Sequence, residues 1–166
     1  MPTDDEITFA DHAGRLYARR YGFPPMVGRL LGYLAVCEPR DQSIADLADA
    51  LLASRSAITG AIKSLETIGL LQRSRSAGER MDRVRIDLTS QQAFGFDIAE
   101  YVEQRDLARE GLEVLKGTSI ERRAVLLHWQ AFSEFLTDNL PKLEKQWKAH
   151  RAALVKAGKL PDESKL

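Results

Sequence analysis

The sequence has 166 residues, enough for one domain or for one compact domain with a helical extension. Lysine and arginine together number 24, as do aspartate and glutamate, so no overall positive field attracts nucleic acid or an anionic membrane. No apolar run approaches the roughly 20 residues that span a bilayer, and residues 1–6 are acidic where a signal peptide would be basic. We therefore expect a cytoplasmic protein with no membrane partner, whose DNA affinity, if any, comes from a local patch.

The start of the chain predicts two helices. Thr3 and Glu6 form a capping-box pattern ahead of apolar residues at helical spacing, and Gly22 ends this helix. Pro24 suits the first turn of a second helix, which the apolar pattern extends to about Cys37. The polar segment 38–42 that follows predicts a turn.

The next segment has the order of elements that is typical of a winged helix. Ser43 caps a short predicted helix, Ser54 caps a second one, and Gly69 ends it. The inward face of this second helix is formed by Ile58, Ala61, Ile62 and Leu65. Two short strands are predicted at 70–75 and 84–88, joined by a charged loop in which Gly78 supplies the turn.

The remainder predicts more helix than a DNA-binding module needs. A capping box at Thr89 and Gln92 starts a helix that continues to Gly117, and a second box at Thr118 starts another. Pro141 is expected to kink or break that helix, leaving a last one before Gly158 and a mobile tail, 159–166.

The predicted fold class is mainly α with a small β wing: a winged helix-turn-helix flanked by N- and C-terminal dimerisation helices. We assign residues 1–23 to an N-terminal helix that contributes to dimerisation and 24–89 to the DNA-binding domain. The C-terminal dimerisation helices occupy 90–158.

The candidate DNA-binding residues are small, polar or basic, as a helix that enters the major groove requires. Those on the second helix of the pair are Ser54, Arg55, Ser56, Thr59, Gly60 and Lys63, and those in the hairpin are Arg73, Arg75, Arg80 and Arg83. Between residues 52 and 86, seven cationic side chains stand against three acidic ones, an excess of four in a neutral protein. Such a patch would bind phosphates, and an arginine at the hairpin tip suits a narrow minor groove.

Residues 24–89 resemble the MarR superfamily of transcriptional regulators, particularly its GbsR-like branch. The resemblance rests on the run of residues 54–70, which ends Leu-Glu-Thr-Ile-Gly-Leu, and on the hairpin sequence Gly-Glu-Arg-Met-Asp-Arg-Val-Arg-Ile. It implies that the helix after Ser54 enters the major groove and that the loop around 80–83 is the wing tip. Arg80 and Arg83 remain alternatives for the arginine that enters the minor groove.

A homodimer on a palindromic operator is expected, because two winged helices about one DNA turn apart discriminate far better than one. The resemblance implies a regulator, a repressor in our interpretation, that a small molecule releases from double-stranded DNA. Candidate ligand-binding residues are Tyr33, Phe96, Trp129 and Phe132. The GbsR-like branch suggests a quaternary ammonium effector, which aromatic rings bind by cation–π attraction.

No catalytic motif, cofactor motif or metal-ligand spacing occurs in the sequence, so we expect neither an enzyme nor a cofactor nor a metal. Cys37 is either a redox switch or a buried helix residue. The rival to a DNA-binding regulator is a winged-helix protein-interaction module that does not bind DNA.

Overall fold

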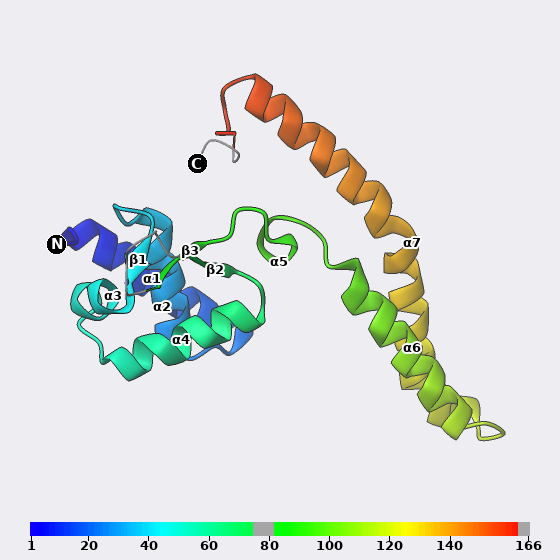
Figure 1. Cartoon of the computed structure of the whole chain (residues 1–166). Coiled ribbons are helices and arrows are strands. Elements are labelled where there is room, and N and C mark those ends of the chain that lie inside the picture. The colour runs from blue at the N-terminus through cyan, green and yellow to red at the C-terminus, as the bar shows by residue number, and fades with distance from the viewer. Residues whose placement is uncertain (75–81, 163–166) are drawn as a thin grey trace. The chain divides into compact units, whose positions relative to one another are not determined.

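The computed structural model describes residues 1–74 and 82–162, which group into two compact units, Met1–Ala93 and Phe94–Leu166. The described residues are mostly helical, with one small antiparallel sheet (Figure 1), which confirms the predicted fold class. In chain order the elements are α1 (Asp4–Tyr21), α2 (Pro25–Val36), β1 (Gln42–Ser43), α3 (Ile44–Ala50), α4 (Arg55–Thr67), β2 (Leu71–Ser74), β3 (Arg83–Ile86), α5 (Gln91–Phe94), α6 (Ile98–Val114) and α7 (Ile120–Lys156).

Local capping chemistry sets the helix boundaries of the first unit. Both halves of the capping box are formed at Thr3 with Glu6, and again at Ser43 with Asp46. Gly69, just beyond α4, has a φ of 69°, the left-handed conformation that a glycine adopts at low cost. These three predictions are confirmed.

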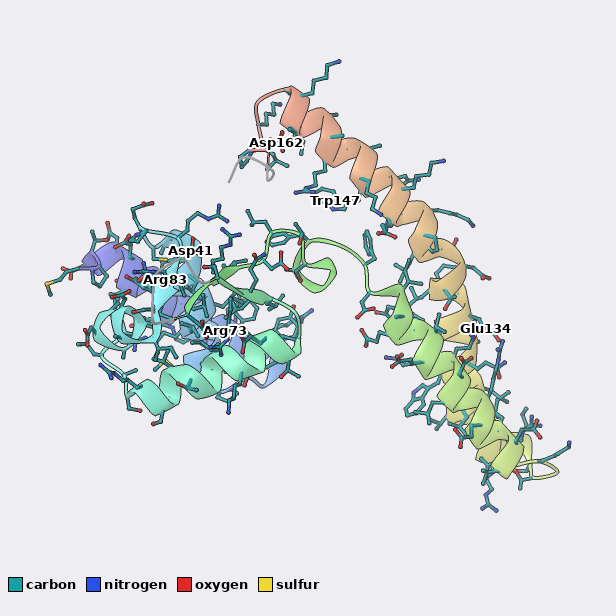
Figure 2. All side chains as sticks on the ribbon, viewed as in Figure 1. Asp41, Arg73, Arg83, Glu134, Trp147 and Asp162 are labelled. Carbon is teal, nitrogen blue, oxygen red and sulfur yellow. The ribbon has the colours of Figure 1, made fainter. Side chains whose placement is uncertain are left out.

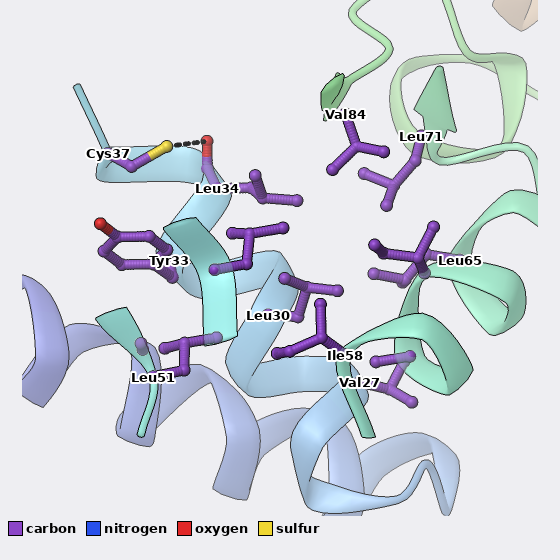
Figure 3. Close-up of a cluster of buried hydrophobic side chains, with 14 of the residues drawn as sticks. Val27, Leu30, Tyr33, Leu34, Cys37, Leu51, Ile58, Leu65, Leu71 and Val84 are labelled. Carbon is purple, nitrogen blue, oxygen red and sulfur yellow. Dashed lines mark hydrogen bonds between the residues drawn. The ribbon is translucent and has the colours of Figure 1, made fainter. Parts of the chain in front are cut away.

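The core of the first unit lies around α2, between α1 on one side and α4 on the other. Figure 3 shows its leucine, isoleucine and valine side chains in contact between these helices and the sheet. The largest fully buried side chains in the described part of this unit are Leu30, Leu47, Leu51, Ile58, Ile62, Leu65 and Val84. The apolar pattern of α2 and α4 therefore has the predicted consequence, a single core beneath the helix-turn-helix.

The sheet has the strand order β1-β3-β2, with Gln42 opposite Val84 and Leu71 opposite Ile86. The sequence analysis predicts β2 and β3 but not β1, whose two residues it places in a turn and at a cap. Val84 is 1% exposed, so the central strand contributes a side chain to the core as well as hydrogen bonds to both neighbours. Residues 75–81, with the predicted turn at Gly78, lie outside the described residues.

The second unit consists mainly of α6 and α7, which lie side by side along part of their length (Figure 1). A salt bridge of 2.8 Å joins Arg109 of α6 to Glu134 of α7. The Trp147 indole donates a hydrogen bond of 2.8 Å to the carbonyl oxygen of Phe94. Few side chains of this unit are buried, and α7 exposes a series of large apolar ones.

Two boundaries in this part of the chain differ from the prediction. The long helix begins at Ile98, not Phe94, because Asp97 caps it, while the Thr89 hydroxyl is bonded to the Asp87 carboxylate. Pro141 does not break its helix: α7 continues through it, since a proline removes one hydrogen bond while the remaining bonds and the packing on α6 persist. Figure 1 shows that α7 is bent.

Along the described residues, no helix has the length and apolar character needed to cross a membrane. Within the same residues, no cluster of three or more histidine, cysteine, aspartate or glutamate side chains is arranged to hold a metal ion.

Glycines allow α1 and α2 to approach closely, and one of them provides a stability test. A Cβ atom at Gly32 would lie 2.5 Å from the Cβ of Ala13, whereas one at Gly60 of α4 would meet nothing within 4 Å. Gly32→Ala should therefore destabilise the protein by about 1–3 kcal/mol through overpacking. The matched Gly60→Ala should stabilise it by about 0.5–1 kcal/mol, because alanine favours a helix interior. Denaturant unfolding measures both, and an unchanged stability of Gly32→Ala would contradict the close packing.

Cys37 provides a pH test. Its side chain is 5% exposed, and burial raises the pKa of its thiol to about 11. At pH 8 only about one thiol in a thousand is then ionised, against roughly a quarter for an ordinary cysteine, because the thiolate forms only as pH approaches the raised pKa. Alkylation by iodoacetamide at pH 8 should be at least about 100-fold slower in the folded protein than in denaturant. Equal rates would favour a redox switch.

Candidate nucleic-acid interface

The helix α4 has one buried and one exposed face, as the sequence predicts. Ile58, Ile62 and Leu65 are 0% exposed and Ala61 is 3% exposed. Because an α-helix repeats every 3.6 residues, burying this stripe directs the opposite stripe to solvent. That exposed stripe contains the predicted reading residues.

The start of α4 is held in place by a residue that the sequence analysis missed. The Arg29 guanidinium of α2 forms an ion pair with Asp11 of α1 and donates a hydrogen bond of 2.8 Å to the carbonyl oxygen of Leu51, at the end of α3. Leu52 follows with a φ of 49°, which turns the chain toward the cap of α4. Arg29 thus connects α1, α2 and the turn between the two helices of the motif. A single charge within an apolar helical stripe is the signal that could have identified it.

Two cations lie on the exposed stripe of α4. Arg55 and Lys63 are exposed, and neither forms a hydrogen bond or ion pair through its side chain within the described part of the chain. Gly60 lies between them in sequence, with open space where a Cβ would be. The exposed stripe therefore presents two unpaired charges on either side of a point where the backbone is accessible.

The beginning of α4 favours an anion. Ser54 caps the helix by accepting a hydrogen bond from the Ala57 amide, and the first turn contains no acidic residue. The helices α1, α3, α6 and α7 each have an acidic side chain in their first turn. Since a helix N-terminus carries a partial positive charge, the start of α4, next to Arg55, is suited to a phosphate.

The hydroxyl groups of α4 are used in part within the helix itself. Thr59 donates to the carbonyl oxygen of Arg55 at 2.8 Å, and the hydroxyls of Ser54 and Ser56 lie 3.0 Å apart. Their oxygens keep lone pairs that accept hydrogen bonds. A base edge or phosphate contact through Thr59 as a donor would first have to break its bond within the helix.

The predicted hairpin contacts that the structure describes, Arg73 and Arg83, form ion pairs, in contrast to the cations of α4. Arg73 forms a two-pronged contact with Glu66, which raises the pKa of its guanidinium. Arg83 lies 3.6 Å from the Asp46 carboxylate and donates to the carbonyl oxygen of Asp41 at 3.3 Å. Figure 2 marks Arg73, Arg83 and Asp41 in the first unit. Hydrogen bonding to Ser43, and then the charge of Arg83, lowers the pKa of Asp46.

Arg73 and Arg83 stay predicted DNA contacts, but each would exchange an ion pair for a phosphate. The other two predicted hairpin contacts, Arg75 and Arg80, lie outside the described residues. The same is true of residues 163–166 in the predicted tail, whereas the amide of Lys159 donates to the carbonyl oxygen of Leu154.

The four predicted ligand-binding residues are divided between the two units. Tyr33 is 5% exposed in the core of the first unit. The second unit contains the partly buried Phe96 and, on α7, Trp129 and Phe132, which are 55% and 59% exposed. The aromatic ligand site stays a prediction.

Comparison with known proteins identifies the family. A MarR family model matches residues 21–80, and a model of MmpR5-like MarR family transcriptional regulators matches residues 91–150. The HTH-type transcriptional regulator MmpR5 of Mycobacterium tuberculosis is 34% identical over 112 residues, which cover 67% of each chain. A crystal structure described as a transcriptional regulator is 26% identical with a TM-score of 0.78, covering 87% of this chain and 99% of its own. The chain therefore belongs to the MarR family of DNA-binding transcriptional regulators and is not an enzyme.

Proposed function

We propose that the chain binds a palindromic operator as a homodimer and represses transcription from the cytoplasm. One observation carries the proposal: Arg55 and Lys63, which have no side-chain partner among the described residues, lie on the exposed stripe of α4, beside a helix N-terminus without an acid. In a protein with no net charge, such a local concentration of cationic groups supports phosphate and base contacts. A dimer seated on a promoter would exclude polymerase sterically, which is why we propose repression.

The apolar surface of the second unit supports the homodimer. On α7, Val125, Trp129, Phe132 and Phe135 are each more than half exposed. A helix of 37 residues is about 55 Å long, and α6, with 17 residues, covers less than half of that length. Apolar side chains at helical spacing on a surface of this kind favour association with a second copy. On α1, Phe9 and Leu16 are also nearly half exposed and would contribute.

Small-molecule control is the least supported part of the proposal. The GbsR-like branch, and with it the quaternary ammonium effector, stays a prediction, while the family model matched over residues 91–150 is MmpR5-like. Trp129 and Phe132 are exposed in a single copy but are assigned above to the dimer surface, so an aromatic site that uses them would lie at that surface. Release of the protein from its operator by choline at saturating concentration would identify the effector as a quaternary ammonium compound.

One observation favours the rival function, a winged-helix interaction module. The hairpin arginines Arg73 and Arg83 already form ion pairs with acidic side chains. A hairpin that binds protein does not need free arginines, so these pairs are compatible with that function. This rival leaves the unpaired charges of α4 unexplained, so we rank it second.

Charge reversal on α4 distinguishes the two functions. Arg55→Glu with Lys63→Glu should abolish specific DNA binding. Because a homodimer carries both substitutions twice, the loss of four phosphate contacts should make the slope of log affinity against log salt shallower by about 3.6. Fluorescence anisotropy on selected operator fragments measures both quantities. Lys145→Glu with Lys159→Glu, which makes the same charge change on exposed residues of the second unit, is the matched control. If the chain is instead an interaction module, the two double variants should have the same DNA affinity and the same salt dependence.

The dimer can be tested by mass in solution. Light scattering on the whole chain should give twice the 18.6 kDa of one copy. Trp129→Glu with Phe132→Glu should shift the protein to monomer, because burying two unpaired charges in an apolar interface costs several kcal/mol. Leu52→Glu introduces a charge at a side chain that is 93% exposed in the first unit and should leave the mass unchanged. A monomeric wild-type protein at about 100 μM would contradict the homodimer.

A further inference from the structure

A groove of about 650 Å³ lies within the first unit, away from the exposed stripe of α4. It is bounded by the start of α1, the segment after α2, the helix α3 and the start of β3. Pro2, Pro39 and Ala50 supply apolar surface to its wall. All of its lining residues belong to the unit Met1–Ala93, and among them only Arg83 is also a predicted DNA contact.

The groove is acidic. Its lining includes the carboxylates of Glu6, Glu38, Asp46 and Asp49, against a single guanidinium, that of Arg83. Even when the amino group of Met1 is counted as a second cation, two negative charges are in excess. Glu6 and Asp46 use one carboxylate oxygen each for their capping boxes. Glu38 and Asp49 are exposed, and their carboxylates have no hydrogen bond or ion pair within the described part of the chain.

The side chain of Tyr33, mostly buried, also reaches the groove. Tyr33 lines the groove although only 5% of the residue is exposed, and its hydroxyl has no hydrogen-bond partner among the described residues. Figure 3 shows the ring with its oxygen directed away from the leucine side chains of the core. Burial, and after it the neighbouring Cys37 thiol and the carboxylates of Glu6 and Asp46, raise the pKa of the Tyr33 hydroxyl above its ordinary value. Because the hydroxyl forms no bond within the described chain and its oxygen is not among the buried unsatisfied atoms, it is open to a ligand that enters the groove.

The chemistry of the groove selects the ligand. No acidic cluster in the described residues is arranged for a metal ion, and the volume far exceeds that of an ion. Carboxylates and a tyrosine oxygen accept hydrogen bonds from ammonium N–H groups. Two excess negative charges match a ligand with two positive charges, and the proline and alanine surfaces suit a carbon chain between them.

We propose that this groove binds an aliphatic diamine, with its ammonium groups bonded to the carboxylates and to the Tyr33 hydroxyl. The groove shares Arg83 with the predicted DNA contacts, but binding of a diamine in the absence of DNA does not rest on the proposed function. A quaternary ammonium compound lacks the N–H donors and should be a poor ligand here, which separates this site from the predicted aromatic one.

Calorimetric titration of the whole chain, without DNA, tests the ligand class. We expect 1,6-diaminohexane to bind one site per chain, at least about tenfold more tightly than hexamethonium, which has the same carbon chain and charges but no N–H groups. Equal binding of the two would overturn the assignment, since only nonspecific charge attraction would then remain. The absence of saturable binding up to about 10 mM diamine would overturn the site itself.

Variants locate the ligand. Glu38→Gln with Asp49→Asn removes two exposed charges without touching the core, and should weaken diamine binding by more than about tenfold. Tyr33→Phe keeps the aromatic ring and should weaken diamine binding by about three- to tenfold through loss of one hydrogen bond. The matched Glu110→Gln with Asp138→Asn, on exposed residues of the second unit, should change it by less than about twofold. Wild-type affinity in the Glu38 and Asp49 variant, or an equal loss in the control, would overturn the proposal.

Discussion

The burial of one stripe of α4 on α2 is the constraint on which the candidate interface depends. Ile58, Ile62 and Leu65 are completely buried, and exposing any one of them would cost about 1.5–3 kcal/mol. The helix therefore cannot rotate about its axis, and the direction of Arg55 and Lys63 follows from side chains that never contact solvent. Near the N-terminal end of α4, Arg29 also holds the preceding turn in place by its ion pair with Asp11 and its hydrogen bond to the carbonyl oxygen of Leu51.

The parts of the fold that the sequence predicts are those decided by neighbouring residues. The capping boxes at Thr3 and Ser43 and the glycine after α4 each need only residues within four positions. The strand β1 could not be predicted in this way, because its two residues become a strand only by pairing with β3, about forty positions later. The continuity of α7 through Pro141 likewise depends on the helix as a whole, including its packing on α6.

The residues of the candidate site also differ in whether neighbouring residues alone predict their environment. The exposed stripe of α4 follows from helical periodicity alone, so its members could be named from the sequence. The pairing of the hairpin arginines could not, because Glu66 lies seven residues from Arg73 and Asp41 lies 42 residues from Arg83. A count of charges between residues 52 and 86 includes these arginines as positive, whereas in the folded chain much of their charge is balanced locally.

This local balance sets how α4 and the hairpin would share the binding of DNA. The Arg73–Glu66 pair is about one-third exposed on both sides, and pairs of this kind contribute at most about 1 kcal/mol, so a phosphate can replace the carboxylate at small cost. The displaced Glu66 would, however, remain beside the duplex and reduce the net gain. Arg55 and Lys63 carry no such penalty, since no carboxylate in the described chain pairs with them. We therefore propose that, among the described residues, α4 provides the larger share of phosphate neutralisation; Arg75 and Arg80 of the hairpin lie outside those residues.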